Sequence, residues 1–281
     1  MLTPRTEHLI DLALEEDAGL GDITSRAIFP AKHRSVAVID AKQDLVVCGL
    51  EVAARVFAKQ DDKLKVKLLA SDGDRVKKGA LVLRVEGSTA SILTAERTAL
   101  NFLQRLSGIA TQAGRYAEAV KGTGVRVVDT RKTTPGWRAL EKYAVRTGGC
   151  FNHRSSLGEQ VLIKDNHIAA AGSLTNAVLR CRVAASHGAK IEVEAKTFAE
   201  VKEAIRADAD IILLDNMTPD EVRTAVKVVA GQALVEVSGG IRFETVRDYA
   251  LAGVDIISIG ALTHSVAAAD LSLDLKTKGR K

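Results

Sequence analysis

Three short clusters of basic and polar residues contain the side chains that are best suited to chemistry. They are Asp129-Thr130-Arg131-Lys132-Thr133-Thr134-Pro135-Gly136, His153-Arg154-Ser155-Ser156 and Lys164-Asp165-Asn166-His167. The first and the third follow short apolar segments, Val125–Val128 and Val161–Ile163. Because the cations stand on separate segments and not along one helix face, they predict a concave site that holds several anionic groups at once. Arginine pairs bidentately with a planar carboxylate, which lysine cannot do.

Two carboxylates stand at the ends of later apolar segments. Glu194 ends one segment, and Asp215 directly follows Ile211–Leu214. Magnesium is commonly held by one or two carboxylates together with substrate phosphates, so these residues predict a metal and sugar site. The alternative is an internal ion-pair network with Lys196 or Lys132. Glu192 lies deeper in the same segment, and we expect it in that network and not in contact with a ligand.

Two glycine-containing turns follow the last two apolar segments. They are Ser238-Gly239-Gly240 and Gly260-Ala261-Leu262. Glycine allows backbone N–H groups to approach a phosphate closely, and barrels often bind phosphate after their final strands. A single such turn is a weak signal, but two at corresponding places predict a phosphate site, with His264 and Ser265 as supporting side chains.

The N-terminal part of the chain has the pattern of an α/β domain. Residues 5–17 have the apolar period of a helix, and residues 91–119 have the same period over a longer stretch. Between them lie segments with the alternation of strands, separated by glycine-containing turns. These segments are Ser35–Asp40, Leu45–Val47, Leu64–Leu69 and Leu81–Val85.

From Val125 onward, short apolar strands alternate with helical stretches. The predicted strands are Val125–Val128, Val161–Ile163, Ile191–Val193, Ile211–Leu214, Leu234–Val237 and Ile256–Ile259. The last four end at intervals of about 21 to 23 residues, which suits successive β/α units of a parallel barrel. A complete eight-stranded barrel takes about 250 residues, and about 150 remain here, so we predict a shortened barrel of six or seven strands. The polar residue after each strand then belongs to one ring at the carboxyl ends.

The composition excludes several classes of protein. The 281 residues are 46% hydrophobic and 27% charged, which is ordinary for a folded enzyme. Aromatic residues make up only 4%, which disfavours nucleic acid binding by base stacking. The apolar runs are too short for a membrane span, and the N-terminus lacks the pattern of a secretory signal. Three widely spaced cysteines without a CxxC pair favour a reducing cytosol, so we expect a cytoplasmic protein.

The motifs together resemble one enzyme family. DTRKTTPG, HRSSL, KDNHI, EVEAKT, LLDNM, EVSGGI and IGALTHS occur in the order and spacing of quinolinate phosphoribosyltransferase, also called nicotinate-nucleotide pyrophosphorylase (carboxylating). The turn at residues 21–24 and the segment at residues 96–101 are similar as well. The resemblance implies an N-terminal α/β sandwich, residues 1–110 completed by residues 268–281, and an incomplete α/β-barrel at residues 111–267.

The resemblance also implies a reaction and a set of roles. Quinolinate and phosphoribosyl pyrophosphate would react, with Mg²⁺ as cofactor, to give nicotinate mononucleotide, pyrophosphate and carbon dioxide. Catalytic roles would fall to Lys132, Glu194 and Asp215, with the last two near the metal. The substrate-binding set would be Arg97, Thr130, Arg131, Lys132, His153, Arg154, Lys164, Glu194, Asp215, Ser238, Gly239, Gly240, Gly260, Ala261 and Leu262. The protein would be a homodimer or a higher homo-oligomer in which Arg97 reaches the neighbouring subunit's site.

Three other functions remain open at this stage. A paralogue of the same fold, of the type associated with molybdenum transport, would use a different acceptor. An aldolase would use Lys164 as a Schiff-base lysine, although its ionic neighbours Asp165 and His167 are unlike the desolvated pocket that such lysines need. A basic dimeric binding module would leave the carboxylates at the strand ends unexplained.

Overall fold

The computed structural model describes residues 2–276, and these residues form two compact units. The first unit contains residues up to 114, residues 135–149 and the chain from residue 266; the second contains residues 115–134 and 150–265. This division differs from the domain boundaries expected from the sequence mainly at residues 135–149, which pack with the first unit. Residues 277–281, which we expected to belong to the C-terminal extension of the first domain, lie outside the described part.

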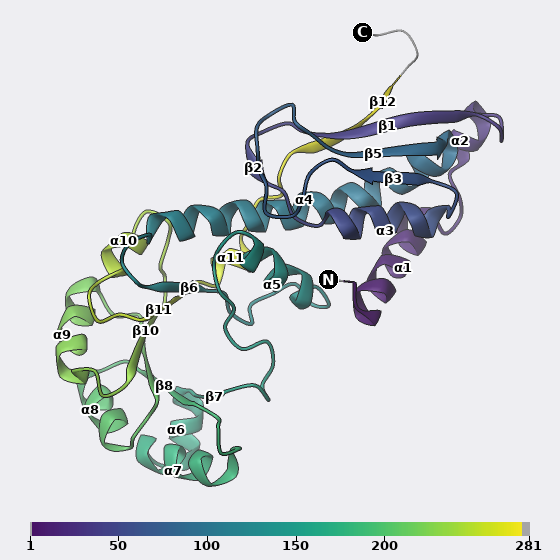
Figure 1. Cartoon of the computed structure of the whole chain (residues 1–281). Coiled ribbons are helices and arrows are strands. Elements are labelled where there is room, and N and C mark those ends of the chain that lie inside the picture. Colours follow the sequence, from purple (N-terminus) through teal and green to yellow (C-terminus); the bar gives the residue numbers. More distant parts are fainter. Residues whose placement is uncertain (1, 277–281) are drawn as a thin grey trace. The chain divides into compact units, whose positions relative to one another are not determined.

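The first unit is built on an antiparallel sheet of four strands in the order β12-β1-β5-β3 (Figure 1). The strands are β1 (Arg34–Ala41), β3 (Lys65–Leu68), β5 (Leu81–Ser88) and β12 (Leu271–Lys276). Two shorter strands, β2 (Leu45–Val46) and β4 (Arg75–Val76), pair separately. The C-terminal strand β12 pairs with β1 over six residues, from Val36 opposite Lys276 to Ala41 opposite Leu271. The end of the chain therefore supplies an edge strand to the N-terminal sheet.

Five helices belong wholly or mainly to this unit. They are α1 (Pro4–Ala18), α2 (Ile23–Ile28), α3 (Leu50–Gln60), α4 (Thr89–Ala119) and α5 (Arg138–Thr147). Residues 50–60 were not predicted to form a helix or strand. Helix α3 forms there because Leu50, Ala53, Val56 and Phe57 recur at the helical period and all four are buried. Helix α4 is close to its predicted bounds, and Phe102, Leu103 and Leu106 on it are among the fully buried side chains.

The second unit contains a parallel sheet of six strands in the order β6-β11-β10-β9-β8-β7. The strands are β6 (Arg126–Val128), β7 (Val161–Ile163), β8 (Ile191–Ala195), β9 (Ile211–Asp215), β10 (Leu234–Ser238) and β11 (Ile256–Ser258). β7 has its predicted bounds, and the other five strands differ from theirs by one or two residues. All five residues of β8 and the first four of β9 are buried, as expected for strands covered on both faces.

Helices alternate with these strands. They are α6 (Asp165–Ala171), α7 (Leu174–Ala184), α8 (Phe198–Arg206), α9 (Pro219–Val229), α10 (Val246–Tyr249) and α11 (Ala261–His264). Figure 1 shows α8 and α9 along the outer side of the curved sheet. Both begin with a capping box, in which Thr197 pairs with Glu200 and Thr218 with Glu221. None of the described helices combines the length and the apolar character that crossing a bilayer requires.

The barrel is incomplete between its first two strands. β6 and β7 follow one another in the chain but lie at opposite edges of the sheet. A single parallel bridge between Val128 and Phe151 continues the edge beside β6, and residues 152–160 then lead to β7. The predicted fold class, an N-terminal α/β sandwich and an incomplete barrel of six or seven strands, is confirmed.

Candidate active site

A cavity of about 860 Å³ lies in the second unit and is lined largely by residues at the carboxyl ends of its strands. The volume is in the range of small-molecule sites. The lining residues are Thr130, Arg131, Lys132, His153, Arg154, Leu162, Lys164, Asp165, Glu194, Leu213, Asp215, Asn216, Glu236, Ser238, Gly239, Gly240, Ile241, Arg242, Ser258, Ile259, Gly260, Ala261 and His264.

The parallel register explains why these residues meet. Glu194 on β8 is level with Leu213 on β9, and Leu213 is level with Glu236 on β10. Asp215 at the end of β9 is level with Ser238 at the end of β10. Since all six strands run in the same direction, residues that follow each strand in the sequence are brought to one edge of the sheet.

The basic part of the cavity contains Arg131, Lys132 and Arg154. Burial, together with the neighbouring Arg131, lowers the pKa of Arg154. Nη1 of Arg154 donates to the carbonyl oxygen of Gln160 at 2.8 Å, which fixes the direction of the guanidinium group. The carbonyl oxygen of Lys132 accepts a hydrogen bond from Thr263 Oγ1 at 2.8 Å. Two guanidinium groups that repel one another form a site that favours an anion between or beside them.

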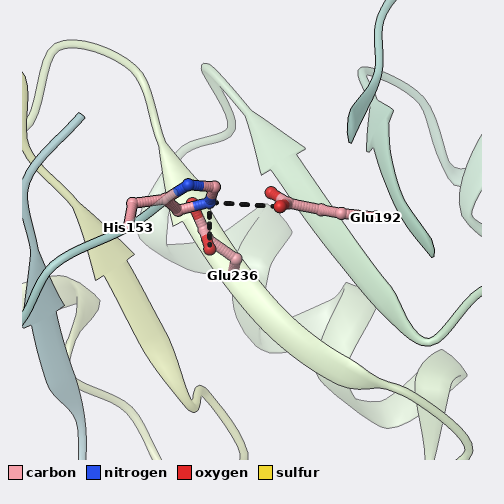
Figure 2. Close-up of side chains that lie close together, drawn as sticks. All are labelled: His153, Glu192 and Glu236. Atoms are coloured by element: carbon pink, nitrogen blue, oxygen red, sulfur yellow. Dashed lines mark hydrogen bonds and ion pairs between the residues drawn. The ribbon is translucent and has the colours of Figure 1, made fainter. Parts of the chain in front are cut away.

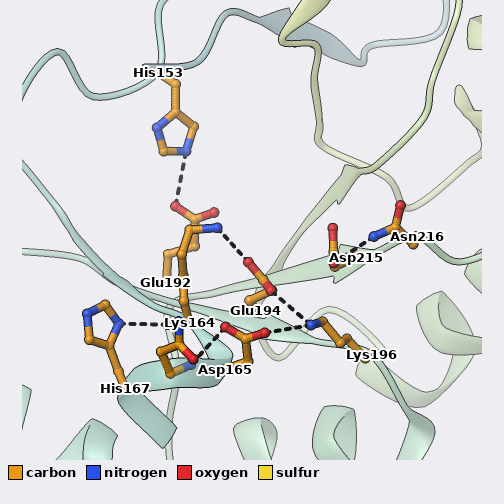
Figure 3. A network of polar contacts seen from close by, with 10 residues as sticks. His153, Lys164, Asp165, His167, Glu192, Glu194, Lys196, Asp215 and Asn216 are labelled. Carbon is orange, nitrogen blue, oxygen red and sulfur yellow. Dashed lines mark hydrogen bonds and ion pairs between the residues drawn. The ribbon is translucent and has the colours of Figure 1, made fainter. Parts of the chain in front are cut away.

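The acidic part contains Glu194 and Asp215 (Figure 3). Glu194 is 8% exposed and pairs with Lys164 Nζ at 2.6 Å and with Lys196 Nζ at 3.7 Å. Lys196 also pairs with Asp165 at 2.8 Å. The network that we considered as an alternative role for Glu194 therefore exists, and Glu194 lines the cavity as part of it.

Asp215 has a different environment from Glu194. Burial raises the pKa of Asp215, and the charge of Glu194 raises it further. Its Oδ2 accepts a hydrogen bond from Nδ2 of Asn216 at 2.8 Å. A carboxylate that is held close to another carboxylate gains from a cation placed between them, so the pair fits a divalent metal with substrate oxygens.

His153 lies against two buried glutamates (Figure 2). Its Nε2 is 3.1 Å from Oε2 of Glu192 and 3.5 Å from Oε2 of Glu236. Burial lowers the pKa of His153, but the hydrogen bond to Glu192 and the ion pair with Glu236 outweigh burial and raise the pKa to about 10. We expected Glu192 to join a network with Lys196 or Lys132, but its hydrogen-bond partners are His153 and Gln160.

The three glycines of the two predicted phosphate turns differ in how much space they leave for a side chain. Gly239 has φ = +100°, and a Cβ added there would meet the Asn216 side chain and lie 2.8 Å from its backbone nitrogen. Gly240 has φ = +61°, and nothing lies within 4 Å of an added Cβ. At Gly260, an added Cβ would lie 3.0 Å from Lys132 Cδ and 3.1 Å from His264 Nε2. The positive φ and the close approach of backbone explain the need for glycine at Gly239, whereas at Gly260 the neighbouring side chains would have to shift by a few tenths of an ångström.

Most residues of the predicted site line this one cavity. Of the predicted turn at residues 260–262, Gly260 and Ala261 line the cavity, but Leu262 does not, because its side chain is completely buried. Arg97 does not line it either: it is exposed on α4 and belongs to the first unit. Its proposed role in a neighbouring subunit's site stays a prediction.

Sequence reasoning did not single out several lining residues. Glu236 lies inside the otherwise apolar strand Leu234–Ser238, and a charged residue at such a position could have marked it as a candidate for the site. Asn216 directly follows Asp215, and Arg242 lies two residues after Gly240, so the ring of polar strand ends could have been extended by one or two positions to include them. Leu213 and Ser258 face the cavity from within strands, which the sequence alone does not indicate.

Comparison with known proteins identifies the family of this chain. The chain matches the family models "Quinolinate phosphoribosyl transferase, C-terminal domain" over residues 109–274 and "Quinolinate phosphoribosyl transferase, N-terminal domain" over residues 22–107. The chain belongs to the quinolinate phosphoribosyl transferase family. The resemblance drawn from the seven motifs is thereby confirmed.

Individual relatives are similar over nearly the whole chain. A probable nicotinate-nucleotide pyrophosphorylase (carboxylating) of Bacillus subtilis is 43% identical over 260 residues, which are 92% of this chain and 90% of that protein. A protein of the same description from Methanocaldococcus jannaschii is 42% identical, with 98% of this chain and 99% of that protein covered. The crystal structure of NadC from Streptococcus pyogenes superposes with a TM-score of 0.94 at 41% identity, covering 98% of each chain.

Proposed function

We propose that this protein transfers the phosphoribosyl group of phosphoribosyl pyrophosphate to quinolinate. The products are nicotinate mononucleotide, pyrophosphate and carbon dioxide, as required in the biosynthesis of NAD. The observation that carries the proposal is a single cavity that combines a pair of arginines, a pair of carboxylates and two glycine turns. Membership of the family and the names of close relatives support the same reaction.

Quinolinate is the acceptor that the basic part of the cavity fits. It carries two carboxylates on adjacent ring carbons, and Arg131 and Arg154 offer planar donors for them. Lys132 adds a third cation to the lining of the same cavity. These side chains orient the acceptor so that its ring nitrogen faces C1 of the ribose, and much of the rate enhancement comes from this positioning.

Glu194 and Asp215 are the residues that would hold Mg²⁺, mostly together with phosphate oxygens of the donor. When bound, the metal supplies positive charge to the pyrophosphate and so makes it a better leaving group. The two carboxylates also offer acceptors for ribose hydroxyls. Ser238, Gly239 and Gly240 present backbone N–H groups to the 5′-phosphate, as the turn after a late barrel strand commonly does.

The reaction requires no protein nucleophile. As the bond from C1 of the ribose to the pyrophosphate oxygen breaks, positive charge develops on the ribose, and the acceptor nitrogen forms the new bond. Lys132 and Lys164 stabilise the departing pyrophosphate electrostatically. The positively charged ring nitrogen then stabilises the carbanion that is left when the adjacent carboxylate departs as carbon dioxide, and this carbon takes up one proton.

The proposal includes assembly and location. The protein acts as a homodimer or a higher homo-oligomer in which Arg97 contributes to the neighbouring subunit's acceptor site; the exposure of Arg97 on α4 supports this. A cytoplasmic location rests on the odd number and wide spacing of the three cysteines.

The test is a comparison of acceptors. Purified protein, Mg²⁺ and phosphoribosyl pyrophosphate are incubated with quinolinate in one reaction and with nicotinate in another, and nicotinate mononucleotide and carbon dioxide are measured. Turnover with quinolinate alone supports the proposal. If folded protein binds phosphoribosyl pyrophosphate and turns over neither acceptor, the proposal is wrong and the paralogue with another acceptor takes its place. Loss of activity after borohydride trapping on Lys164 would indicate an aldolase.

A further inference from the structure

Residues 152–160 lead across the gap between the two edges of the incomplete barrel to β7. They carry Arg154, so the contacts that hold this segment also determine where Arg154 lies in the cavity. A bridge from Phe151 to Val128 joins the start of this segment to the sheet, and β7 begins at its end. Within the segment, Arg154 Nη1 donates to Gln160 O at 2.8 Å, and the Arg154 backbone N–H donates to His153 Nδ1 at 2.8 Å. Gln160 therefore holds the guanidinium group of Arg154, and His153 holds the backbone that carries it.

Both of these residues attach to glutamates inside the barrel. His153 Nε2 faces Glu192 Oε2 at 3.1 Å and Glu236 Oε2 at 3.5 Å, and Gln160 Nε2 donates to Glu192 Oε2 at 2.8 Å. Glu192 comes from β8 and Glu236 from β10, so the segment is held from two strands that β9 separates (Figure 2).

The two glutamates are buried where a barrel normally has apolar side chains. Glu192 is 0% and Glu236 is 1% exposed, and Oε1 of Glu192 and both oxygens of Glu236 have no hydrogen-bond partner within the described residues. Buried carboxylates with so few donors are costly, and this cost makes a nearby proton donor or cation strongly favourable. The charged groups around the His153 ring are Glu192, Glu236 and Arg154, and Arg131 lies beside Arg154. In addition, Asp129 Oδ1 accepts a hydrogen bond from the backbone N–H of His153 at 3.0 Å.

The hydrogen bonds identify the nitrogen that carries the ring proton. The two glutamates favour the form of the His153 ring that is protonated on both nitrogens. The backbone N–H of Arg154 donates to Nδ1 and so favours the form that is protonated on Nε2 alone. Both place a proton on Nε2, which is the atom that faces the glutamates. His153, Glu192 and Glu236 could also be considered a metal site, since their ligand atoms lie within 4.8 Å of one another. Metal on Nε2 would leave the proton of a neutral ring on Nδ1, against the N–H of Arg154, so the geometry favours a proton over a metal.

We propose that Glu192 and Glu236 are positioning residues for the acceptor: from inside the barrel they anchor residues 152–160 through His153 and Gln160, and so determine where Arg154 meets the acceptor's carboxylate. The inference rests on the proposed function for the identity of the acceptor. The anchor itself does not depend on that identity.

The kinetic test uses Glu236→Gln, which preserves shape and removes charge. The KM for quinolinate should rise about tenfold or more, as expected for loss of the buried ion pair between Glu236 and His153, while the KM for phosphoribosyl pyrophosphate changes by less than about twofold. Glu203→Gln is the matched control, because Glu203 on α8 accepts hydrogen bonds from Thr175 on α7 and does not line the cavity. In a His153→Gln background, Glu236→Gln should add little, since its effect passes through His153.

The structural test uses the wild-type protein labelled with ¹⁵N-histidine and assigned with His153→Gln. The Nε2–H of His153 should give a persistent hydrogen-bonded NMR signal from pH 6 to about 9. In Glu236→Gln this signal should exchange rapidly or be lost within that range. Because the spectrum of the wild-type protein is read directly, the anchor can be tested even if a variant fails to fold.

Three results would overturn the inference. One is a His153 ring in the wild-type protein whose proton lies on Nδ1. Another is an equal rise in the KM for quinolinate in Glu236→Gln whether or not His153 is present. The last is a stoichiometric metal ion in the purified protein that His153→Gln removes. If the wild-type protein binds but does not turn over quinolinate, the proposed function fails, and the NMR experiment still decides the anchor.

Discussion

Gly239 offers the sharpest test of how the phosphate turn and the carboxylate Asp215 depend on one another. Alanine at this position adopts φ = +100°, which costs about 1–2 kcal/mol for a residue with a Cβ. The added Cβ would also lie 2.6 Å from Cγ and 2.8 Å from the backbone nitrogen of Asn216. The backbone atom cannot rotate away, so overpacking adds about 1–3 kcal/mol. We expect Gly239→Ala to lower the free energy of unfolding by about 2–5 kcal/mol.

Gly240→Ala is the matched control because it lies in the same turn. It also has a positive φ, +61°, but an added Cβ has nothing within 4 Å. Its expected cost is the backbone contribution alone, about 1–2 kcal/mol. Urea unfolding of both variants measures the difference directly.

The effect of Gly239→Ala on activity follows from the same contact. Relief of the clash moves the amide of Asn216, whose Nδ2 holds Asp215 Oδ2 at 2.8 Å. We therefore expect a higher KM for phosphoribosyl pyrophosphate and a lower kcat at a temperature where the variant is folded, with the KM for quinolinate less affected. Equal destabilisation of the Gly239 and Gly240 variants would refute the steric argument, and a normal kcat in folded Gly239→Ala would refute the link to Asp215.

Three further predictions concern other parts of the site. Arg131→Ala should lower kcat/KM for quinolinate by at least about 100-fold while the fold and the binding of phosphoribosyl pyrophosphate persist; near-normal turnover would exclude the proposed acceptor site. The carboxylate form of Asp215 is the active one, so kcat/KM for phosphoribosyl pyrophosphate should fall when the pH is lowered through the pKa of Asp215. Because this pKa is raised, the fall should occur at a higher pH than it would for an ordinary aspartate. Glu194→Gln removes one cause of the raised pKa, so this decline should move to lower pH in normalised profiles; an unmoved decline would assign it to another group. If Arg97 acts in the neighbouring subunit, then Arg97→Ala and Arg131→Ala proteins, each inactive alone, should regain about one quarter of wild-type activity when subunits are exchanged, and no recovery would place both residues in one chain's site.

Local patterns in the sequence were sufficient for much of the barrel. Short apolar segments such as Val161–Ile163 and Ile211–Leu214 predicted strands β7 and β9 to within a residue or two. The residues that follow them, Lys164 and Asp215, line the cavity. Such predictions succeed because the polar residue that ends a buried strand is a local feature of the chain, and parallel strands carry all such residues to one edge.

Two features of the structure were not predicted correctly: the helix at residues 50–60 and the orientation of the Leu262 side chain. Helix α3 has a regular helical period at residues 50–60, yet it lies among segments with strong strand patterns. Leu262 follows Gly260 and Ala261 in a turn that lines the cavity, but its side chain is turned into the core. Which residues of a short helix face a cavity depends on how the helix is rotated, and a four-residue helix such as α11 has too few positions to reveal this.

The sequence by itself determined the order of the strands along the chain, the chemical types at their ends and, through its motifs, the family. Only the tertiary structure decided which of these groups meet. Glu192 and Glu236 are 44 residues apart and come together with His153 because β9 places β8 and β10 on its two sides. Ion pairs such as Lys164 with Glu194 likewise follow from strand order and register. Contacts of this kind arise from the packing of the whole sheet, so no local pattern specifies them.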